Sequence, residues 1–375
     1  MRVLIFGPYP APGQPISGGV MAVVHTLAQG LAQRNVTVGV VTAAAGGEDR
    51  DEEDGRVRVY RRGIPRLPRT RRHRTIRGKL LEAAHHFRPA IIHAHGTGYY
   101  AAAALDGLWP VVITAHGVVY EEARRSQARG LKERLAWRYD ARLESDVLKR
   151  ARFAIAINPY IRQAFAEYEH LHWFHIPNPV DDAFFGIART PEPGRFFTPA
   201  RVIPRKGVDI LIQAFAAAAD RFPQAQLRIA GETASMPDFV RQCRALAAKS
   251  GIADRVHFLG NLDRDALVEE YGRAWVTVLA SRQETAPVAI GEAFAAGCPV
   301  IATRVGGVPW MVHQGVNGLL VHPEDDEALA HALMHALSAG DEVDAWSRNA
   351  RTAAQSYRLE AILDATLAAY RRVLS

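Results

Sequence analysis

The sequence predicts an α/β protein built from two doubly wound parallel-sheet domains that face each other across a cleft. Short apolar runs alternate along the chain with segments of helical apolar spacing, which is the pattern of βα units in a parallel sheet. This alternation stops at a Pro-rich, irregular stretch, residues 176–194, and then restarts. A length of 375 residues is enough for two such domains, each with its own core.

In the first half, apolar positions recur every three or four residues from Val20 to Leu31, which predicts a helix over 20–34. The segment that follows residue 60 is rich in arginine and is expected to be a loop as far as residue 77. Strands are predicted at 3–7 and 36–42, a weak strand at 57–60, and buried strands at 90–93, 111–114 and 154–157. Helices are also predicted at 76–87, between the strands at 90–93 and 111–114, and at 131–150.

In the second half, the same alternation predicts strands near 196 and at 226–230, 256–259, 275–279 and 300–302. Helices are expected at 208–221, at 237–249, from 265, from about 287 and at 325–337. These elements give domains at 1–180 and 194–356. The last helix, at about 357–375, is a candidate to pack back onto the first domain. A ligand is expected at the carboxyl ends of the strands, because doubly wound sheets bind there.

Composition narrows the class of protein. Apolar residues make up 48% of the chain and charged residues 23%, which is typical of soluble globular proteins. Two cysteines, Cys243 and Cys298, provide no disulfide framework and suit a reducing cytosol. No apolar run is long enough to span a membrane or to form a signal peptide. The sequence therefore predicts a cytoplasmic protein.

The basic charge is concentrated between Arg56 and Lys79, where eleven basic residues occur without any acidic one. One interpretation is a solvated loop. The other is contact with an anionic surface, either phospholipid headgroups at the inner face of the membrane or a lipid diphosphate. Nucleic acid is a poorer candidate, because Tyr60 is the only aromatic residue that interleaves with these arginines.

Two carboxylates distinguish the stretch from residue 281 to 307. Glu292 lies inside an otherwise apolar helix, where a buried carboxylate needs a partner. A carboxylate that accepts two hydrogen bonds suits the two hydroxyls of a ribose. Glu284 precedes the helix and is placed to accept hydrogen bonds from a sugar. The alternative for Glu292 is an internal salt bridge with Arg304 or Arg282.

Arg201 and Lys206 belong to the first βα loop of the second domain, together with Pro204 and Gly207. Two cations beside a glycine and a helix N-terminus form an anion site that suits a diphosphate. The alternative is two cations on the surface, with Arg205 as a third. The spacing around the proline and the glycine favours the anion site.

Two further groups follow strands of the first domain. Gly18 and Gly19 lie between the first strand and the first helix, where glycine lets a ligand approach the backbone, although any tight turn could use such a pair. His116 closes the strand at 111–114, and His93 and His95 end the preceding strand. We expect one histidine to be functional and favour His116. A zinc site is disfavoured because no helical i, i+4 pair is present.

Taken together, these motifs resemble the retaining glycosyltransferases of family 4, which have the GT-B fold of two Rossmann-like domains. The resemblance covers nearly the whole chain, and the motifs are specific as a set. In chain order they are S-G-G-V, T-A-H-G, I-P-N-P-V-D, A-R-V-I-P-R-K-G-V-D, I-A-G-E, H-F-L-G, E-T-A-P-V-A-I-G-E-A-F-A-A-G-C-P-V-I-A-T, V-G-G-V-P and G-V-N-G-L-L-V.

The resemblance implies an acceptor-binding first domain and a donor-binding second domain. It implies that Glu292 holds the donor ribose and that Glu284 holds the donor sugar. It further implies three residues at the diphosphate, namely Arg201, Lys206 and Gly19. His116 would contact the transferred sugar, so the implied catalytic group is His116, Glu284, Arg201 and Lys206.

The sequence departs from the family at Pro287, where many members have glycine. Proline lacks a backbone N–H, so the donors near the sugar would be those of Thr285, Ala286 and Val288. This departure leaves the identity of the sugar open.

The implied function is transfer of a sugar from a nucleoside-diphosphate sugar, expected to be a UDP-sugar, to a hydroxyl of a glycan or lipid-linked glycan. Such a role belongs to polysaccharide biosynthesis. No cofactor or metal is expected, and Asp263, in the Asp-x-Asp triplet at 263–265, is interpreted as a helix cap. Two alternatives are a nucleotide-sugar epimerase or hydrolase on the same fold and a non-catalytic sugar-nucleotide-binding protein.

Overall fold

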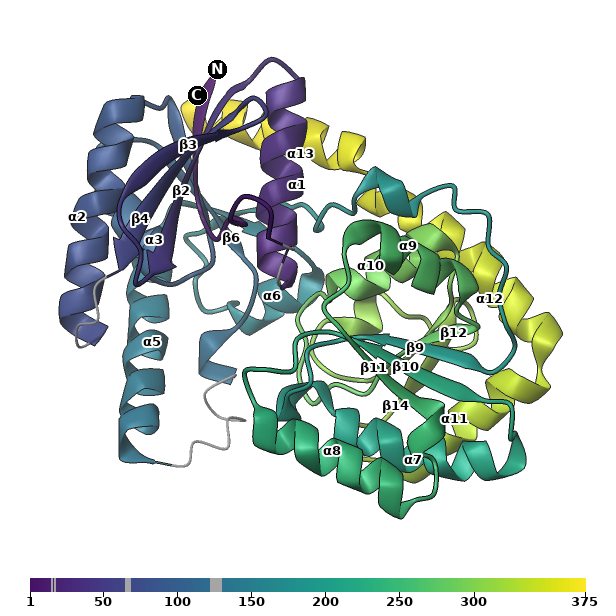
Figure 1. Ribbon diagram of the computed structural model, residues 1–375. Helices are drawn as coiled ribbons and strands as arrows, with labels where there is room; N and C mark the ends of the chain where they lie inside the picture. The colour runs from purple at the N-terminus through teal and green to yellow at the C-terminus, as the bar shows by residue number, and fades with distance from the viewer. Residues whose placement is uncertain (15, 17, 65–68, 122–129) are drawn as a thin grey trace. The chain divides into compact units, whose positions relative to one another are not determined.

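The computed structural model describes residues 1–375 except 15, 17, 65–68 and 122–129 (Figure 1). The chain forms two compact units. The first comprises Met1–Pro179 and Leu359–Ser375, and the second comprises Val180–Arg358. The last helix, α13 (Leu359–Leu374), therefore belongs to the first unit.

The first unit is built on an eight-stranded sheet in the order β3-β4-β2-β1-β5-β6-β7-β8. Every neighbouring pair is parallel except β3 and β4. The strands are β1 (Arg2–Phe6), β2 (Thr37–Ala45), β3 (Arg50–Asp54), β4 (Val57–Ile64), β5 (Ile91–His95), β6 (Val111–Ala115), β7 (Phe153–Ala156) and β8 (His172–His175). The helices are α1 (Gly19–Gln33), α2 (Arg69–Phe87), α3 (Tyr99–Leu105), α5 (Leu131–Arg150), α6 (Pro159–Ala164) and α13.

The helices α1 and α13 lie side by side and share a core with the sheet (Figure 1). Val3 and Ile5 of β1 are fully buried in this core, together with Leu31 of α1 and Tyr370 of α13. Gly30 permits the close approach, because a Cβ atom there would lie 3.0 Å from a methyl group of α13. Apolar packing thus fixes α13 to the first unit.

The second unit has a six-stranded, fully parallel sheet in the order β11-β10-β9-β12-β13-β14. Its strands are β9 (Arg195–Pro199), β10 (Gln226–Ala230), β11 (Val256–Gly260), β12 (Val276–Leu279), β13 (Val300–Thr303) and β14 (Gly318–Val321). Its helices are α7 (Val208–Arg221), α8 (Pro237–Lys249), α9 (Arg264–Arg273), α10 (Val288–Ala296), α11 (Asp326–Ser338) and α12 (Gly340–Ala353). Short 3-10 turns are η1 (Asp182–Phe184), η2 (Pro204–Lys206), η3 (Ala253–Arg255), η4 (Val308–Trp310) and η5 (Ala354–Tyr357).

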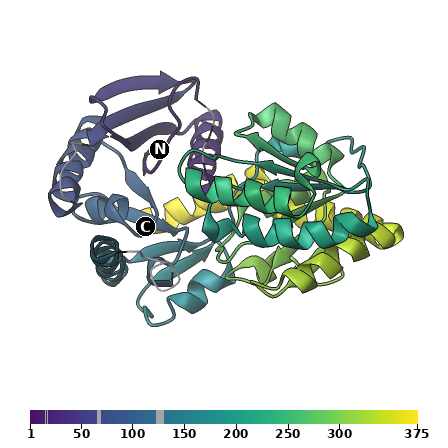
Figure 2. The same ribbon diagram turned by 60° about the horizontal axis from the view of Figure 1, so that its bottom comes forward.

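Helices cover both faces of this sheet (Figure 2). The helices α7, α8 and α11 contribute to one apolar core, and α9, α10 and α12 contribute to the other. Burial on both faces explains why the strands are continuous apolar runs in the sequence rather than alternating ones. The prediction of two parallel-sheet α/β domains is confirmed.

The expectation of a loop from residue 61 to 77 is wrong for the described residues. Strand β4 continues to Ile64, and α2 begins at Arg69. Strand β4 is longer than predicted because the edge strand β3 pairs with it. The sequence of β3, R-D-E-E-D, has no apolar residue, so the sequence pattern did not predict this strand. It pairs antiparallel with β4, and its carboxylates meet the arginines of that strand.

These pairs neutralise part of the basic segment. Arg61 is buried and donates to Glu52 over 2.9 Å, and Arg62 pairs with Asp51 at 2.7 Å. Lys79 pairs at 2.7 Å with Asp49, in the loop before β3. The side chains of residues 65–72 lie outside the described part of the chain, so contact of this segment with an anionic surface stays a prediction.

Residues 180–194, which we expected to belong to a linker, pack within the second unit. Phe184 is buried there, and its ring meets that of Tyr271 edge-on with the centroids 5.6 Å apart.

Within the described residues, no helix has both the length and the apolar character that crossing a bilayer requires.

Candidate functional site

The strand order places a ligand site in the second unit. The chain leaves β9 toward β10 on one side and later returns to β12 on the other side of β9. The loops that follow β9 and β12 therefore meet at a topological switch point, at the carboxyl edge of the sheet, where doubly wound sheets bind their ligands. The first loop carries Arg201 and Lys206, and the second carries Glu284.

An ion pair joins these two loops. The Nζ of Lys206 donates a hydrogen bond to Oε1 of Glu284, and the hydroxyl of Ser281 donates to the same oxygen over 2.7 Å. Arg205 adds a second positive charge 3.9 Å from Oε2. Burial alone would raise the pKa of Glu284, but the two cations outweigh it and lower this pKa below its usual value. Glu284 is therefore an ionised hydrogen-bond acceptor at neutral pH.

The backbone around the ion pair is fixed by contacts between the same loops. The amide of Arg282 donates to the carbonyl of Arg205 over 2.9 Å, and its guanidinium makes two bonds of 2.9 Å to Asp209. Gly207 has a φ of 62°, and a Cβ atom at this position would lie 1.9 Å from the carbonyl oxygen of Ala280. Only glycine therefore allows the two loops to approach this closely.

Glu292 lies on α10, the helix that follows the Glu284 loop, and it is half-buried. The hydroxyl of Tyr271 donates to its Oε2 over 2.8 Å. Burial raises the pKa of Glu292 to about 7, the bond from Tyr271 opposes this increase, and the negative charge of Asp181 adds to it. Hydrogen-bond donors of a bound ligand would stabilise the ionised form of such a carboxylate.

The salt bridge considered for Glu292 is not formed. In the described part of the chain no arginine pairs with this carboxylate. Arg282 pairs instead with Asp209 and Glu324.

The helix α10 begins at Val288, and Pro287 occupies the capping position with a φ of −63°. Thr285 and Ala286 lie just before this start. The positive end of the helix dipole is thus next to the Glu284 loop, where it favours an anion.

Arg201 is exposed on the β9–α7 loop, and the side chains that the structure joins directly are those of Lys206 and Glu284.

In the first unit, the order reverses between β1 and β5, so the loops after these two strands share an edge. Gly18 has a φ of 91°, and Gly19 starts α1 beside it. Both glycines are exposed. The glycine pair is therefore open at the switch point, as close approach of a ligand to the backbone requires.

The three histidines lie together in the first unit. His93 and His95 are in β5, and His116 follows the adjacent strand β6. The Nδ1 of His95 is 2.8 Å from Nε2 of His116, and the two rings are stacked. Burial lowers the pKa of His93 to about 3 and that of His116 to about 4. These rings are neutral at physiological pH.

Models of two families match the chain. The model described as glycosyl transferases group 1 matches residues 181–353, and the model described as glycosyltransferase family 4 matches residues 17–184. The two matches together span residues 17–353, so the chain belongs to the glycosyltransferases that these models describe.

Curated relatives of this glycosyltransferase include two D-inositol 3-phosphate glycosyltransferases. That of Streptomyces griseus is 34% identical over 183 residues, which cover 47% of this chain and 38% of the relative. That of Saccharomonospora viridis is 34% identical over 180 residues, which cover 47% and 42%. The chain thus matches less than half the length of either relative.

Solved structures place the glycosyltransferase in the GT-B fold. Sucrose-phosphate synthase from Thermosynechococcus elongatus superposes with a TM-score of 0.85 at 24% identity, covering 99% of this chain and 98% of the other. HepE from Anabaena, solved in complex with UDP and glucose, gives a TM-score of 0.76 at 20% identity, with 98% of both chains covered. At these identities the likeness shows the fold alone.

The Asp-x-Asp triplet at residues 263–265 has a structural role. The Oδ1 of Asp263 accepts a hydrogen bond of 2.9 Å from the amide of Ala266 and caps α9, which confirms the interpretation as a cap. The described residues contain no cluster of three or more side chains suited to hold a metal ion.

Several residues at these sites were not identified from the sequence. Ser281 lies three residues before Glu284, a spacing that could have indicated a hydrogen bond. Tyr271 contacts Glu292, and the backbone of Arg282 contacts that of Arg205 in the Lys206 loop. The two residues of each pair are far apart in the sequence, so only the folded structure shows these contacts.

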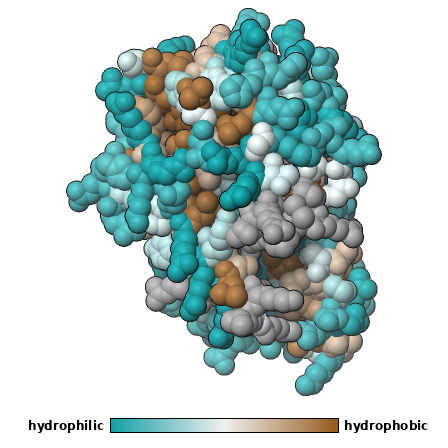
Figure 3. All heavy atoms as spheres, turned by 90° about the vertical axis from the view of Figure 1, so that its left-hand side faces the viewer, coloured by the Kyte–Doolittle hydropathy of each residue, from teal (hydrophilic) through white to brown (hydrophobic). Residues whose placement is uncertain are grey.

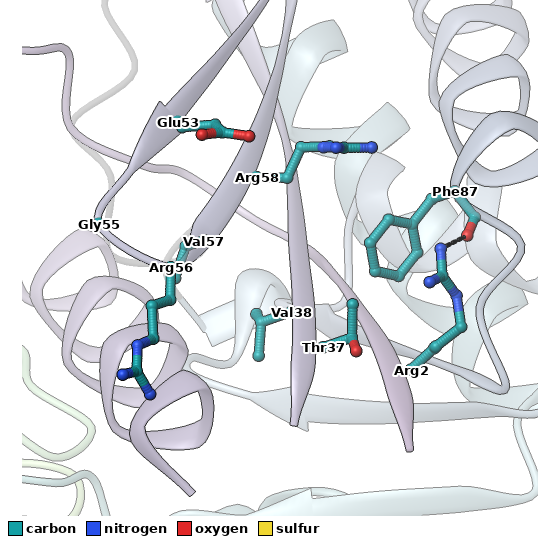
Figure 4. A pocket seen from close by; sticks show the side chains of 9 residues that line it. All are labelled: Arg2, Thr37, Val38, Glu53, Gly55, Arg56, Val57, Arg58 and Phe87. Atoms are coloured by element: carbon teal, nitrogen blue, oxygen red, sulfur yellow. Dashed lines mark hydrogen bonds between the residues drawn. The ribbon is translucent and has the colours of Figure 1, made fainter. Parts of the chain in front are cut away.

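Two pockets lie away from the candidate residues. One, of ≈ 240 Å³, is at the amino ends of β1, β2 and β4, the edge opposite to the glycines and histidines. Figure 4 shows that Arg2 turns to the carbonyl of Phe87 there and that Arg56 points away from both. The other, of ≈ 340 Å³, lies between α2, α3 and α5.

The face over α2 and α5 is mostly hydrophilic, with a strip of apolar atoms (Figure 3). Of the charged side chains that line the pocket between these helices, Arg77 and Arg150 both pair with Asp106. Neither of these two pockets contains a residue predicted for the site.

Proposed function

We propose that this glycosyltransferase moves a sugar from a nucleoside-diphosphate sugar to an acceptor hydroxyl with retention of configuration at the anomeric carbon. The observation that carries the proposal is the ion pair of Lys206 and Glu284 at the switch point of the second unit, next to the start of α10. A cation, an ionised acceptor and a helix N-terminus together provide the groups that a sugar diphosphate needs.

Each part of the donor has a matching group. Lys206 and the positive end of α10 oppose the charge that develops on the diphosphate as it leaves. Arg201, on the same loop as Lys206, adds positive charge, and Gly19 leaves room for a phosphate near the backbone of the first unit. Glu284 accepts hydrogen bonds from sugar hydroxyls, and Glu292 accepts them from the ribose. A UDP-sugar is the favoured donor, because HepE was solved with UDP and glucose.

Retention follows if the acceptor hydroxyl attacks from the face that the diphosphate leaves. The bond from the anomeric carbon to the phosphate oxygen breaks, and a bond from this carbon to the acceptor oxygen forms. The acceptor proton passes to an oxygen of the leaving diphosphate, so no protein nucleophile is required. Lys206 and α10 supply positive charge at the leaving group, which supports transfer without a metal.

The acceptor is proposed to be a glycan or a lipid-linked glycan, in the biosynthesis of a polysaccharide. Binding at the inner face of an anionic membrane, through the basic segment between Arg56 and Lys79, remains a prediction.

The proposal is tested by incubating the protein with UDP-, GDP- and ADP-sugars, with and without glycan acceptors, and following the anomeric proton of each product by NMR. We expect acceptor-dependent transfer from one nucleotide, with the anomeric configuration of the donor preserved. Rapid formation of free or epimerised sugar without an acceptor would instead establish a hydrolase or an epimerase. Tight nucleotide binding with no turnover of any donor would establish a binding protein.

Glu292 predicts a pH dependence of nucleotide binding. Its pKa is about 7 in the free protein, so the carboxyl is mostly protonated below this pH. The ionised form accepts both ribose hydroxyls, so donor binding favours it and lowers the pKa. The affinity for UDP should therefore rise as the pH increases from 6 to 8, by up to about tenfold for each unit that binding shifts the pKa.

Calorimetric titration of UDP across this pH range measures the effect. Glu292→Gln is the control, because it retains the slope that comes from the phosphates of the nucleotide and loses the contribution of the carboxyl. Equal slopes in the two proteins would show that Glu292 does not ionise on binding.

A further inference from the structure

Five side chains of the first unit form one polar array, namely those of His93, His95, His116, Thr114 and Tyr370. The rings of His93 and His95 have their centroids 4.2 Å apart, and those of His95 and His116 are 5.1 Å apart at an interplanar angle of 18°. His93 contacts the hydroxyl of Tyr370 at 2.7 Å and that of Thr114 at 2.6 Å.

The two nitrogens of His95 have different surroundings. Its Nδ1 is 2.8 Å from Nε2 of His116, so one of these two atoms carries the shared proton. Its Nε2 is buried and has no hydrogen-bond partner among the described residues. In a neutral imidazole one nitrogen is a donor and the other is an acceptor. The proton on His95 is therefore either on Nδ1, facing His116, or on Nε2, away from that partner.

The second arrangement is the costlier one. A proton on Nε2 of His95 would leave a buried N–H without an acceptor in the described part of the chain, and orphaned N–H groups are rarer in proteins than under-used acceptors. A proton on Nδ1 is used in the bond to His116 and leaves only a lone pair unmatched. The first arrangement makes Nε2 of His116 the acceptor, so a neutral His116 must carry its own proton on Nδ1.

We propose that His95 is a positioning residue that holds His116 as the Nδ1–H tautomer, so that His116 presents a fixed hydrogen-bond donor to an oxygen of the transferred sugar. This inference rests on the proposed function and on the role that the sequence leads us to expect for His116, which is contact with the transferred sugar. His116 is only half-buried, so part of its ring is accessible.

The rest of the array keeps the ring of His95 in place. Both nitrogens of His93 are occupied by hydroxyl groups, so its ring has a fixed orientation against that of His95. One of these hydroxyls belongs to Tyr370 of α13, the last helix of the chain. The C-terminal helix thus supports the array.

Burial keeps the array uncharged. The pKa of His95 is well below its usual value, because the ring is buried and because His93 and His116 oppose a positive charge there. A neutral His116 donates a hydrogen bond without changing its protonation, so its contribution does not depend on pH between 6 and 8.

Two substitutions separate the hydrogen bond from the packing of the ring. His95→Phe keeps an aromatic ring between the two histidines and removes the donor. His95→Asn loses the ring and places an amide N–H close to the position of Nδ1, so it restores the donor. Thermal unfolding of both variants reports any loss of stability, which a purely structural role would produce in each.

The tautomer of His116 is read by long-range ¹H–¹⁵N NMR of the free protein, with His116→Gln used for the assignment. We expect Nδ1–H in the wild type and in His95→Asn, and a shift to Nε2–H in His95→Phe. The kcat for sugar transfer should fall about tenfold or more in His95→Phe, with a smaller change in KM, and should largely return in His95→Asn.

A wild-type His116 with its proton on Nε2, or an unchanged tautomer in His95→Phe, would overturn the inference. These results do not depend on catalysis. If His116→Gln transfers sugar at the wild-type rate while the tautomers are as expected, then the expected contact of His116 with the transferred sugar fails and the assignment of the tautomer stands.

Discussion

Replacing Lys206 with Met should lower kcat/KM for sugar transfer by about 10²- to 10³-fold, the range observed when one preorganised electrostatic contact to a developing charge is removed. Methionine keeps most of the length and apolar volume of the side chain, so the change is mainly the loss of one positive charge. This charge faces the leaving diphosphate in the proposed mechanism, where its value is greatest in the transition state.

The substitution has a second consequence at Glu284. Lys206 contributes most to holding the pKa of this buried carboxyl low, so its removal should raise that pKa. The residual activity of Lys206→Met should then increase with pH, as Glu284 ionises. Lys249→Met is the matched control, because Lys249 is exposed at the C-terminal end of α8. Equal activity of the two variants would remove Lys206 from the site.

Gly207→Ala should destabilise the second unit by about 3–5 kcal/mol, a size that strain or severe misfit produces. The residue has a φ of 62°, and this left-handed conformation alone costs an alanine about 1–2 kcal/mol. The added Cβ atom would also lie 1.9 Å from the carbonyl oxygen of Ala280, so the loops of Lys206 and Glu284 must separate. Nucleotide binding should be lost together with this stability.

Gly251→Ala separates the cost of the left-handed backbone from the cost of the close contact with Ala280. Gly251 has a similar φ of 68°, but an added Cβ atom has no neighbour within 4 Å among the described residues. This variant should lose only about 1–2 kcal/mol and should bind nucleotide normally. Denaturant unfolding of both proteins measures the difference. If the two substitutions cost the same, then the close approach of the loops is not what requires glycine at position 207.

The elements of the second unit are largely predictable because its strands are buried on both faces and its helices have clear starts. Helix α8 begins at a proline, and α7 follows a glycine. The strand β3 of the first unit has no such signal. Its side chains are charged, and it is stable because β4 offers it both backbone hydrogen bonds and arginines.

At the candidate site, too, the sequence predicts single residues better than it predicts their contacts. Motifs in the chain indicate Glu284, Glu292 and Lys206, because carboxylates in apolar surroundings and cations near glycine are unusual. They do not indicate that Lys206 pairs with Glu284 or that Tyr370 contacts His93, since these partners are 78 and 277 residues apart. Contacts of this kind depend on the order of the strands and on the return of α13, which local patterns do not encode.

The most direct test of the donor site is calorimetric titration of the wild type and Lys206→Met with UDP and with uridine. Uridine shares the base and the ribose but has no phosphate, so it reports on Glu292 without Lys206. We predict that the wild type binds UDP more tightly than uridine, and that Lys206→Met loses most of this difference while its affinity for uridine is unchanged. Equal affinities of the two proteins for UDP would contradict the assignment of the diphosphate to Lys206.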